Sequence, residues 1–142
     1  MQWNLFTIAE VIALHDRAIA TNELQGLAVG KSLDGALARI EHRIQYGIIV
    51  DVFDLAATYA MAIAQGHVFN DANKRTAYAC MSLCLIKHGV RIAFDTDAAG
   101  EVIIQIARRE MDEGELADWL RRKSEEEEAK KKTKLILECL SP

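Results

Sequence analysis

Apolar side chains recur along most of this chain at intervals of three and four residues, which is the spacing of one face of an α-helix. The first such stripe covers residues 8 to 20 and follows a capping-box pattern made by Thr7 and Glu10. A segment with turn residues and weak periodicity, 21 to 31, separates it from a second helix, 33 to 44, which a serine precedes. The pattern therefore predicts two amphipathic helices joined by a loop.

The middle of the chain holds two nearly continuous apolar stretches, which are typical of buried helices. Asp51 is the expected N-cap of the first stretch, and Gly66 is its expected stop. The second stretch begins near Asn73 and ends at Gly89. A short polar loop lies between them, so we expect this loop to join two central helices.

The C-terminal third begins with a departure from this regularity. Residues 90 to 95, VRIAFD, alternate between apolar and polar as a short strand does. Thr96 or Asp97 is then expected to cap a helix over residues 98 to 109, and a final helix is expected from about Asp112. Taken together, the pattern predicts an all-α fold, a compact bundle of about six helices with the polar loop between the two central helices.

The composition changes from Ser124 onward, where the chain reads SEEEEAKKKTKLILECLSP. Glutamates precede lysines by four residues in this stretch, and such pairs stabilise a solvated helix by about 0.2–0.5 kcal/mol each. The predicted organisation is therefore one domain, residues 1–123, followed by a charged helical extension, residues 124–142. Its last apolar residues fit either packing on the domain or contact with a partner.

Composition and charge exclude several classes of protein. A chain of 142 residues is long enough for one domain, and no apolar run approaches the roughly 18 residues that a membrane span needs. A net charge of −4 argues against a nucleic-acid partner, and three cysteines do not make a disulfide framework. No signal peptide is visible, so we expect a cytoplasmic protein without a membrane partner.

The densest run of functional side chains is GHVFNDANKRTAYA, residues 66–79, in the loop between the central helices. A helix that begins near Asn73 presents unpaired backbone N–H groups and its positive dipole end to this loop, which is a geometry that attracts phosphate. Lys74 and Arg75 add positive charge, and Ala72 leaves room for close approach to the backbone. We therefore expect these four residues to bind a polyphosphate.

Two further residues of the loop suggest transfer of a phosphorus-containing group. Asp71 offers an oxygen ligand of the kind that Mg²⁺ prefers, and His67 is near enough to accept a proton from an attacking hydroxyl. Phe69, apolar in a polar loop, is expected to point inward and anchor it. The spacing by itself also fits a capped helix start with solvated charges and no chemistry.

The run HVFNDANKR, residues 67 to 75, resembles the signature of the Fic/Doc family, and within it the death-on-curing (Doc) toxins. The likeness continues in ALHD near the start and in DLAATYAMAIAQG before the histidine, and it covers about residues 5 to 123. Fic enzymes, which transfer AMP from ATP to a hydroxyl, have Gly where this chain has Lys74 and a second Arg where it has Tyr78. The resemblance therefore implies a nucleotide bound differently from that of Fic enzymes.

The resemblance also implies a function, cofactors and partners. Doc toxins transfer the γ-phosphate of ATP to a threonine of elongation factor Tu, which arrests translation, and a prevents-host-death (Phd) antitoxin neutralises them. Carried over, His67 is the general base, Asp71 holds Mg²⁺ or orients His67, and the phosphates are held by Asn73, Lys74 and Arg75. The expected protein is thus a serine/threonine kinase of a toxin–antitoxin module that uses ATP and Mg²⁺. Fic-like AMP transfer and an inactive antitoxin-binding homologue are the alternatives.

Other features of the sequence suggest less chemistry. Cys80, Cys84 and His88 share a helix face at a spacing that suits a metal, but no fourth ligand is evident and buried core residues explain them better. His15 is expected to be structural. Residues 22 to 32 lie where the family has its substrate-facing flap, so the resemblance predicts that the protein target docks there.

Overall fold

This computed structural model describes residues 2–141, which contain six helices joined by loops. In chain order they are α1 (Ile8–Ala18), α2 (Leu33–Gln45), α3 (Val52–Gly66), α4 (Asn73–Lys87), α5 (Thr96–Ala107) and α6 (Glu113–Leu140). The described residues contain no strand, and one isolated antiparallel bridge joins Leu27 to Phe69. The predicted all-α class with about six helices is confirmed.

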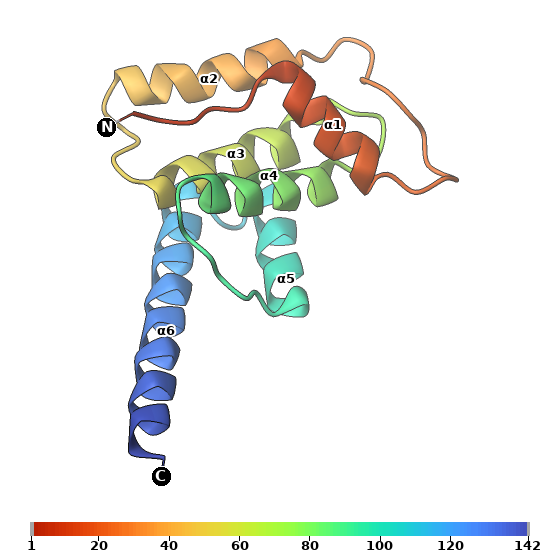
Figure 1. Ribbon diagram of the computed structural model, residues 1–142. Helices are drawn as coiled ribbons and strands as arrows, with labels where there is room; N and C mark the ends of the chain where they lie inside the picture. The colour runs from red at the N-terminus through yellow and green to blue at the C-terminus, as the bar shows by residue number, and fades with distance from the viewer. Residues whose placement is uncertain (1, 142) are drawn as a thin grey trace.

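The centre of the molecule is the antiparallel pair α3 and α4, as Figure 1 shows. Nine of the fifteen residues of α3 are buried, because its apolar positions extend around most of the helix. α1 and α2 cover one side of this pair, and α5 and α6 lie on the other. None of the helices in residues 2–141 combines the length and apolarity that a bilayer crossing requires.

The helix starts follow local capping signals. The predicted caps of the first three helices are confirmed at Thr7, Ser32 and Asp51. The cap predicted for α5 is wrong: Asp95 caps it rather than Thr96 or Asp97, because the Asp95 side chain accepts the N–H of Ala98. α5 consequently begins two residues earlier than predicted.

The strand predicted for residues 90–95 is wrong. Val90, Ile92 and Phe94 pack against the core while Arg91 and Ala93, which alternate with them, are exposed, so the alternation itself is real. No second strand lies beside this segment in the described part of the chain; instead the Ala93 N–H donates to the Glu127 side chain of α6. Alternation indicates a segment with one face on the core, whereas a strand also needs a neighbouring backbone.

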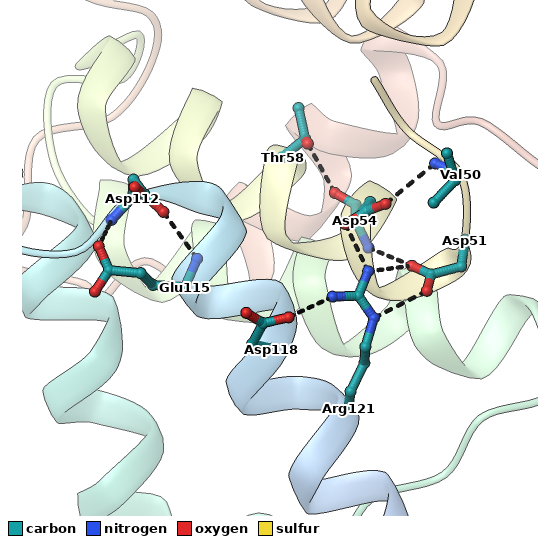
Figure 2. A network of polar contacts seen from close by, with 8 residues as sticks. All are labelled: Val50, Asp51, Asp54, Thr58, Asp112, Glu115, Asp118 and Arg121. Atoms are coloured by element: carbon teal, nitrogen blue, oxygen red, sulfur yellow. Dashed lines mark hydrogen bonds and ion pairs between the residues drawn. The ribbon is translucent and has the colours of Figure 1, made fainter. Parts of the chain in front are cut away.

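One arginine ties α6 to the N-terminal end of α3. Arg121 donates to both carboxylate oxygens of Asp51, at 2.9 and 3.0 Å, and to Asp54 and Asp118, each at 2.7 Å (Figure 2). Burial alone would raise the pKa of Asp51. Hydrogen bonds from Arg121 and from the Asp54 N–H outweigh burial, so the pKa of Asp51 lies below its ordinary value.

Replacing Arg121 by alanine is expected to lower the free energy of unfolding by about 2 kcal/mol at neutral pH, because hydrogen bonds to charged groups contribute about 1.5–3 kcal/mol. A carboxylate whose pKa is lowered by folding stabilises the fold above its unfolded pKa, and this contribution disappears as the pH falls through the lower, folded pKa. The difference between wild type and Arg121→Ala should therefore shrink in acid. Urea unfolding followed by circular dichroism, near neutral pH and at about pH 3, measures both effects. Arg39→Ala, on an exposed face of α2, is the control; an equal loss in the two variants would contradict the prediction.

Candidate active site

The polar loop between α3 and α4 is bounded by two residues in the left-handed backbone conformation. His67, with φ 49°, is the C-cap of α3, and Ala72, with φ 64°, is the N-cap of α4. Neither is glycine, and this conformation costs residues with a side chain roughly 1–2 kcal/mol. Such residues persist only where their surroundings hold them, and they are frequent at functional sites.

Phe69 anchors this loop in the core, as predicted. Its side chain is 2% exposed, and its ring stacks on that of His15 with centroids 3.8 Å apart. His15 Nε2 lies 2.8 Å from the backbone oxygen of Asp71, and because a carbonyl only accepts, Nε2 carries the hydrogen. Asn73 closes the loop: its amide donates to the Phe69 oxygen at 2.9 Å and accepts the Phe69 N–H at 3.1 Å. His15 is therefore structural, as expected, and it positions the loop.

A second segment, which we name the strap (residues 20–31), runs along this loop. The Ala28 N–H donates to the Val68 oxygen at 2.8 Å, and the Asn70 N–H donates to the Gly26 oxygen at 3.1 Å. These backbone bonds fix the path of the strap across the start of α4. The strap therefore forms part of the wall of the site.

The start of α4 is an open set of backbone donors. Ala72 provides no side-chain cap, and in residues 2–141 nothing accepts the N–H groups of Asn73, Lys74 and Arg75. A cavity of 370 Å³ lies before them and is lined by residues 70–75 together with Glu23, Ala64, His67 and Ala107. It contains every site residue named from the sequence: His67, Asp71, Ala72, Asn73, Lys74 and Arg75. Unpaired N–H groups at a helix start favour an anionic ligand.

Asp71 and His67 line this cavity without touching each other. Asp71 Oδ2 accepts the Leu24 N–H of the strap at 2.8 Å, and no hydrogen bond joins Asp71 to His67 in the described structure. No group of three or more His, Cys, Asp or Glu side chains within residues 2–141 is placed to hold a metal ion. A Mg²⁺ ion would therefore use Asp71 Oδ1 together with phosphate and water oxygens, and this kind of ligand set suits Mg²⁺.

Glu23 of the strap is a residue of the site that sequence analysis missed. Arg75 donates to the Glu23 carboxylate with one nitrogen and to the Ala18 oxygen, at 2.9 Å, with the other. Hydrogen bonds from Arg75 and from the Ala20 N–H hold the pKa of Glu23 below its ordinary value, and Glu23 raises the pKa of Arg75. A carboxylate therefore already lies beside Arg75. Glu23 is 52 residues away in sequence, in a loop, so no spacing pattern could have indicated the contact.

The cysteines of α4 belong to the core. Burial raises the pKa of both Cys80 and Cys84 to about 12, which disfavours the thiolates that a zinc ion would need. His88 uses both ring nitrogens within the fold, one on the Cys84 oxygen and the other on the Asn4 N–H. These contacts explain the three residues as packing and capping groups.

Comparisons with known proteins agree on one family. A sequence model described as the Fic/DOC family matches residues 5–85, which include the loop and all of α3. "Protein kinase doc" of Escherichia phage P1 is 39% identical over 114 residues, which are 80% of this chain and 90% of the phage protein. "Toxin Doc" of Mycolicibacterium smegmatis is 36% identical over 84 residues, which are 56% of this chain and 64% of that toxin.

Proposed function

Because this chain belongs to the Fic/DOC family and is a Doc-type toxin, we propose that it transfers the γ-phosphate of ATP to a threonine of elongation factor Tu in the cytoplasm. The observation that carries the proposal is that His67 and the unpaired backbone donors at the start of α4 line the same cavity. The relative at 39% identity is named a protein kinase, which supports phosphate transfer. Arrest of translation would follow from modification of the factor.

His67 acts as the general base in this proposal. The target hydroxyl oxygen attacks the γ-phosphorus, and that bond forms as the bond from the γ-phosphorus to the bridging oxygen of the β-phosphate breaks. The hydroxyl proton passes to the imidazole, and ADP leaves. His67 is exposed and has no hydrogen-bond partner in residues 2–141, so a ring nitrogen is available for the proton.

The start of α4 holds the phosphates. The backbone N–H groups of residues 73–75 and the side chains of Lys74 and Arg75 supply donors and positive charge. The Asn73 side-chain amide is engaged by Phe69, so Asn73 contributes its backbone N–H and the shape of the loop. Ala72 keeps the approach to the backbone open. Asp71 would hold Mg²⁺, which neutralises phosphate charge when bound.

Lys74 favours phosphate transfer over AMP transfer. A lysine at this position places a long cation where a Fic enzyme has an open glycine nest, and Tyr78 replaces the second arginine clamp. The exposed Lys74 side chain therefore competes with the phosphate arrangement that presents the α-phosphorus to His67.

Incubation of the purified protein with elongation factor Tu and isotopically labelled ATP tests the proposal. Label on the γ-phosphate should appear on a threonine of the factor, and label on the α-phosphate should not. Transfer of the α-label would instead establish AMP transfer. If neither label were transferred, the remaining alternative would be a homologue that binds the antitoxin and has no transferase activity.

Glu23→Gln is expected to raise the affinity for ATP by up to about fivefold, the upper effect expected of an exposed ion pair, because it removes a carboxylate that competes with phosphate for Arg75. Isothermal titration with Mg²⁺ and ATP measures the change. Glu41→Gln removes an equal charge at an exposed position of α2 and serves as the control. A weaker affinity would mean that Glu23 holds Arg75 in its binding position instead of competing with the ligand.

A second cavity suits the antitoxin of the toxin–antitoxin pair. Its volume is 440 Å³, and its wall of Tyr78, Gly100, Ile103 and Ile104 is apolar, with Lys74 and Arg75 among its other lining residues. An amphipathic helix of a Phd-type antitoxin would place apolar side chains in this cavity and an acidic one beside the two cations. An antitoxin bound in this way would occupy Lys74 and Arg75, so ATP could not bind to them at the same time.

The strap is the expected docking surface for the protein target. Leu24, Leu27 and Val29 are exposed on it, Val29 completely. Backbone bonds to the loop hold these apolar side chains next to the cavity that contains His67. A target bound there would bring its hydroxyl to the catalytic loop.

A further inference from the structure

The C-terminal half of α6 projects from the body as a lone helix (Figure 1). The buried residues of α6 are Leu116, Ala117 and Leu120, all within its first eight residues, and every residue from 128 to 141 is exposed. Most helical stability comes from packing, and isolated helices shorter than roughly 12–15 residues are marginal in water. We therefore expect the projecting part of α6 to be stabilised by packing against another surface.

Exposed aliphatic side chains gather at the end of this helix. Leu135, Ile136, Leu137 and Leu140 are between 60 and 75% exposed. Scattered single apolar residues are normal on a surface, but four within six positions form a patch of the kind that marks an interaction site. The patch lies beyond every helix of the body.

Charge on the projecting helix is divided into two blocks. Four glutamates occupy residues 125–128, and lysines fill all but one of residues 130–134, with Ala129 between the blocks. The pairs predicted at i,i+4 between these blocks do not form; Lys123–Glu126 and Lys131–Glu128 contacts at i,i+3 occur in their place. In residues 2–141 no partner is found for Glu125, Lys130 and Lys132, so their charges remain available to another molecule.

We propose that α6 is a dimerisation helix that packs antiparallel against α6 of a second copy of this chain, with Ala129 at the two-fold axis. In this arrangement the acidic block of each copy lies beside the basic block of the other, whereas a parallel pair would place like charges together. The same sequence is therefore complementary to itself in one orientation only. The small Ala129 side chain permits the closest approach at the axis.

The geometry of α6 provides a free face for this contact. Positions separated alternately by four and three residues share one side of a helix, and these are residues 118, 122, 125, 129, 132 and 136, all exposed. At 100° per residue this face is opposite Leu116, Ala117 and Leu120, which pack on the body. A second helix can therefore run along α6 without meeting the rest of the molecule.

Side chains on the two copies match in this alignment. Ile136 of each copy lies opposite Arg122 of the other, whose aliphatic stem can cover it while the guanidinium stays in water. Glu125 lies beside Lys132 of the second copy, and Glu126 lies near Lys130. Each of these contacts occurs twice because of the two-fold symmetry.

The proposed dimer leaves the candidate active site open. Arg121 fixes α6 to the N-terminal end of α3, and the catalytic loop follows the C-terminal end, a helix of fifteen residues and thus about 22 Å away. Dimerisation and phosphate transfer therefore use separate surfaces. The inference does not rest on the proposed enzymatic activity.

Sedimentation analysis of the full chain tests the proposal. The wild type should be a dimer at low salt, and high salt should weaken it because the contacts are ionic. Glu125→Lys combined with Glu126→Lys should raise the dissociation constant by about tenfold or more, and adding Lys130→Glu and Lys132→Glu should restore dimerisation. Glu41→Lys combined with Glu110→Lys makes the same change of net charge away from α6 and should leave the dimer intact. A monomeric wild type would overturn the proposal.

Cysteine cross-linking tests the orientation and register. In a Cys139→Ser background, Ala129→Cys should form a disulfide with its own copy under mild oxidation, because the two positions meet at the axis. Thr133→Cys should not do so, because its two copies would lie about 12 Å apart along the helices, but it should cross-link to Glu125→Cys in a mixture. Self-cross-linking of Thr133→Cys as efficient as that of Ala129→Cys would mean a parallel pair and would refute the antiparallel dimer.

Discussion

His67→Ala is expected to lower the rate of phosphate transfer to elongation factor Tu by about 10²–10⁴-fold, which is the usual contribution of a general base. His67 lines the cavity in front of the start of α4, where we propose that phosphate binds, and its imidazole has no other partner in the described chain. Its loss removes the group that takes the hydroxyl proton and leaves the phosphate donors in place. Initial rates with γ-labelled ATP measure the effect.

The fold and the nucleotide site should survive this substitution. His67 is exposed, and alanine can adopt its left-handed backbone at a cost of about 1–2 kcal/mol at most. His67→Asn is a second variant for which this conformation is easier, and it lacks a comparable base. Both variants should bind ATP as the wild type does, and His42→Ala, on an exposed part of α2, should retain full transfer. Undiminished transfer by both His67 variants would exclude His67 as the base.

Phe69→Ala is expected to lower the free energy of unfolding by about 3–5 kcal/mol, which is typical of truncating a buried aromatic side chain. The ring is almost completely buried and stacks on His15, which also bonds to the backbone of Asp71. Its removal should therefore release the loop that carries His67 and weaken ATP binding as well. Chemical unfolding and isothermal titration measure the two effects.

Phe69→Leu is the matched variant for this prediction. Leucine keeps most of the buried apolar volume and loses the ring stack, which is worth about 0.5–1.5 kcal/mol beyond area burial. It should therefore lose much less stability than Phe69→Ala and retain ATP binding. If Phe69→Ala lost stability but bound ATP normally, the Asn73 and strap contacts alone would suffice to hold the loop.

Local signals made most of the fold predictable. A cap depends on residues within one turn, so Thr7, Ser32 and Asp51 could be identified from their neighbours alone. The cap of α5 was placed one or two residues too late because Asp95, Thr96 and Asp97 can all accept an N–H, and only the backbone path decides among them. Segment 90–95 shows what periodicity cannot predict: whether an alternating segment becomes a strand depends on pairing with a backbone that is distant in sequence.

The candidate site also has a part that the sequence predicts and a part that it does not. Its loop residues lie within nine positions of one another, so the motif identified His67, Asp71 and Arg75 together, while their assigned roles stay predictions. The partner of Arg75 is different, because Glu23 comes from a strap whose path is set by backbone bonds to the loop. Long-range contacts between irregular segments leave no periodic trace in a sequence.

The strap touches the phosphate side of the cavity through Glu23 and presents Val29 to solvent at its other end. A macromolecule that shifts the strap would also alter the ion pair between Glu23 and Arg75, and thereby the free energy of the nucleotide binding that we propose. Thermodynamic linkage makes this effect reciprocal: if the docked protein changes the affinity for ATP by some factor, ATP changes the affinity for that protein by the same factor. The twelve residues of the strap, 20–31, would thus couple the binding of ATP to the binding of the docked protein.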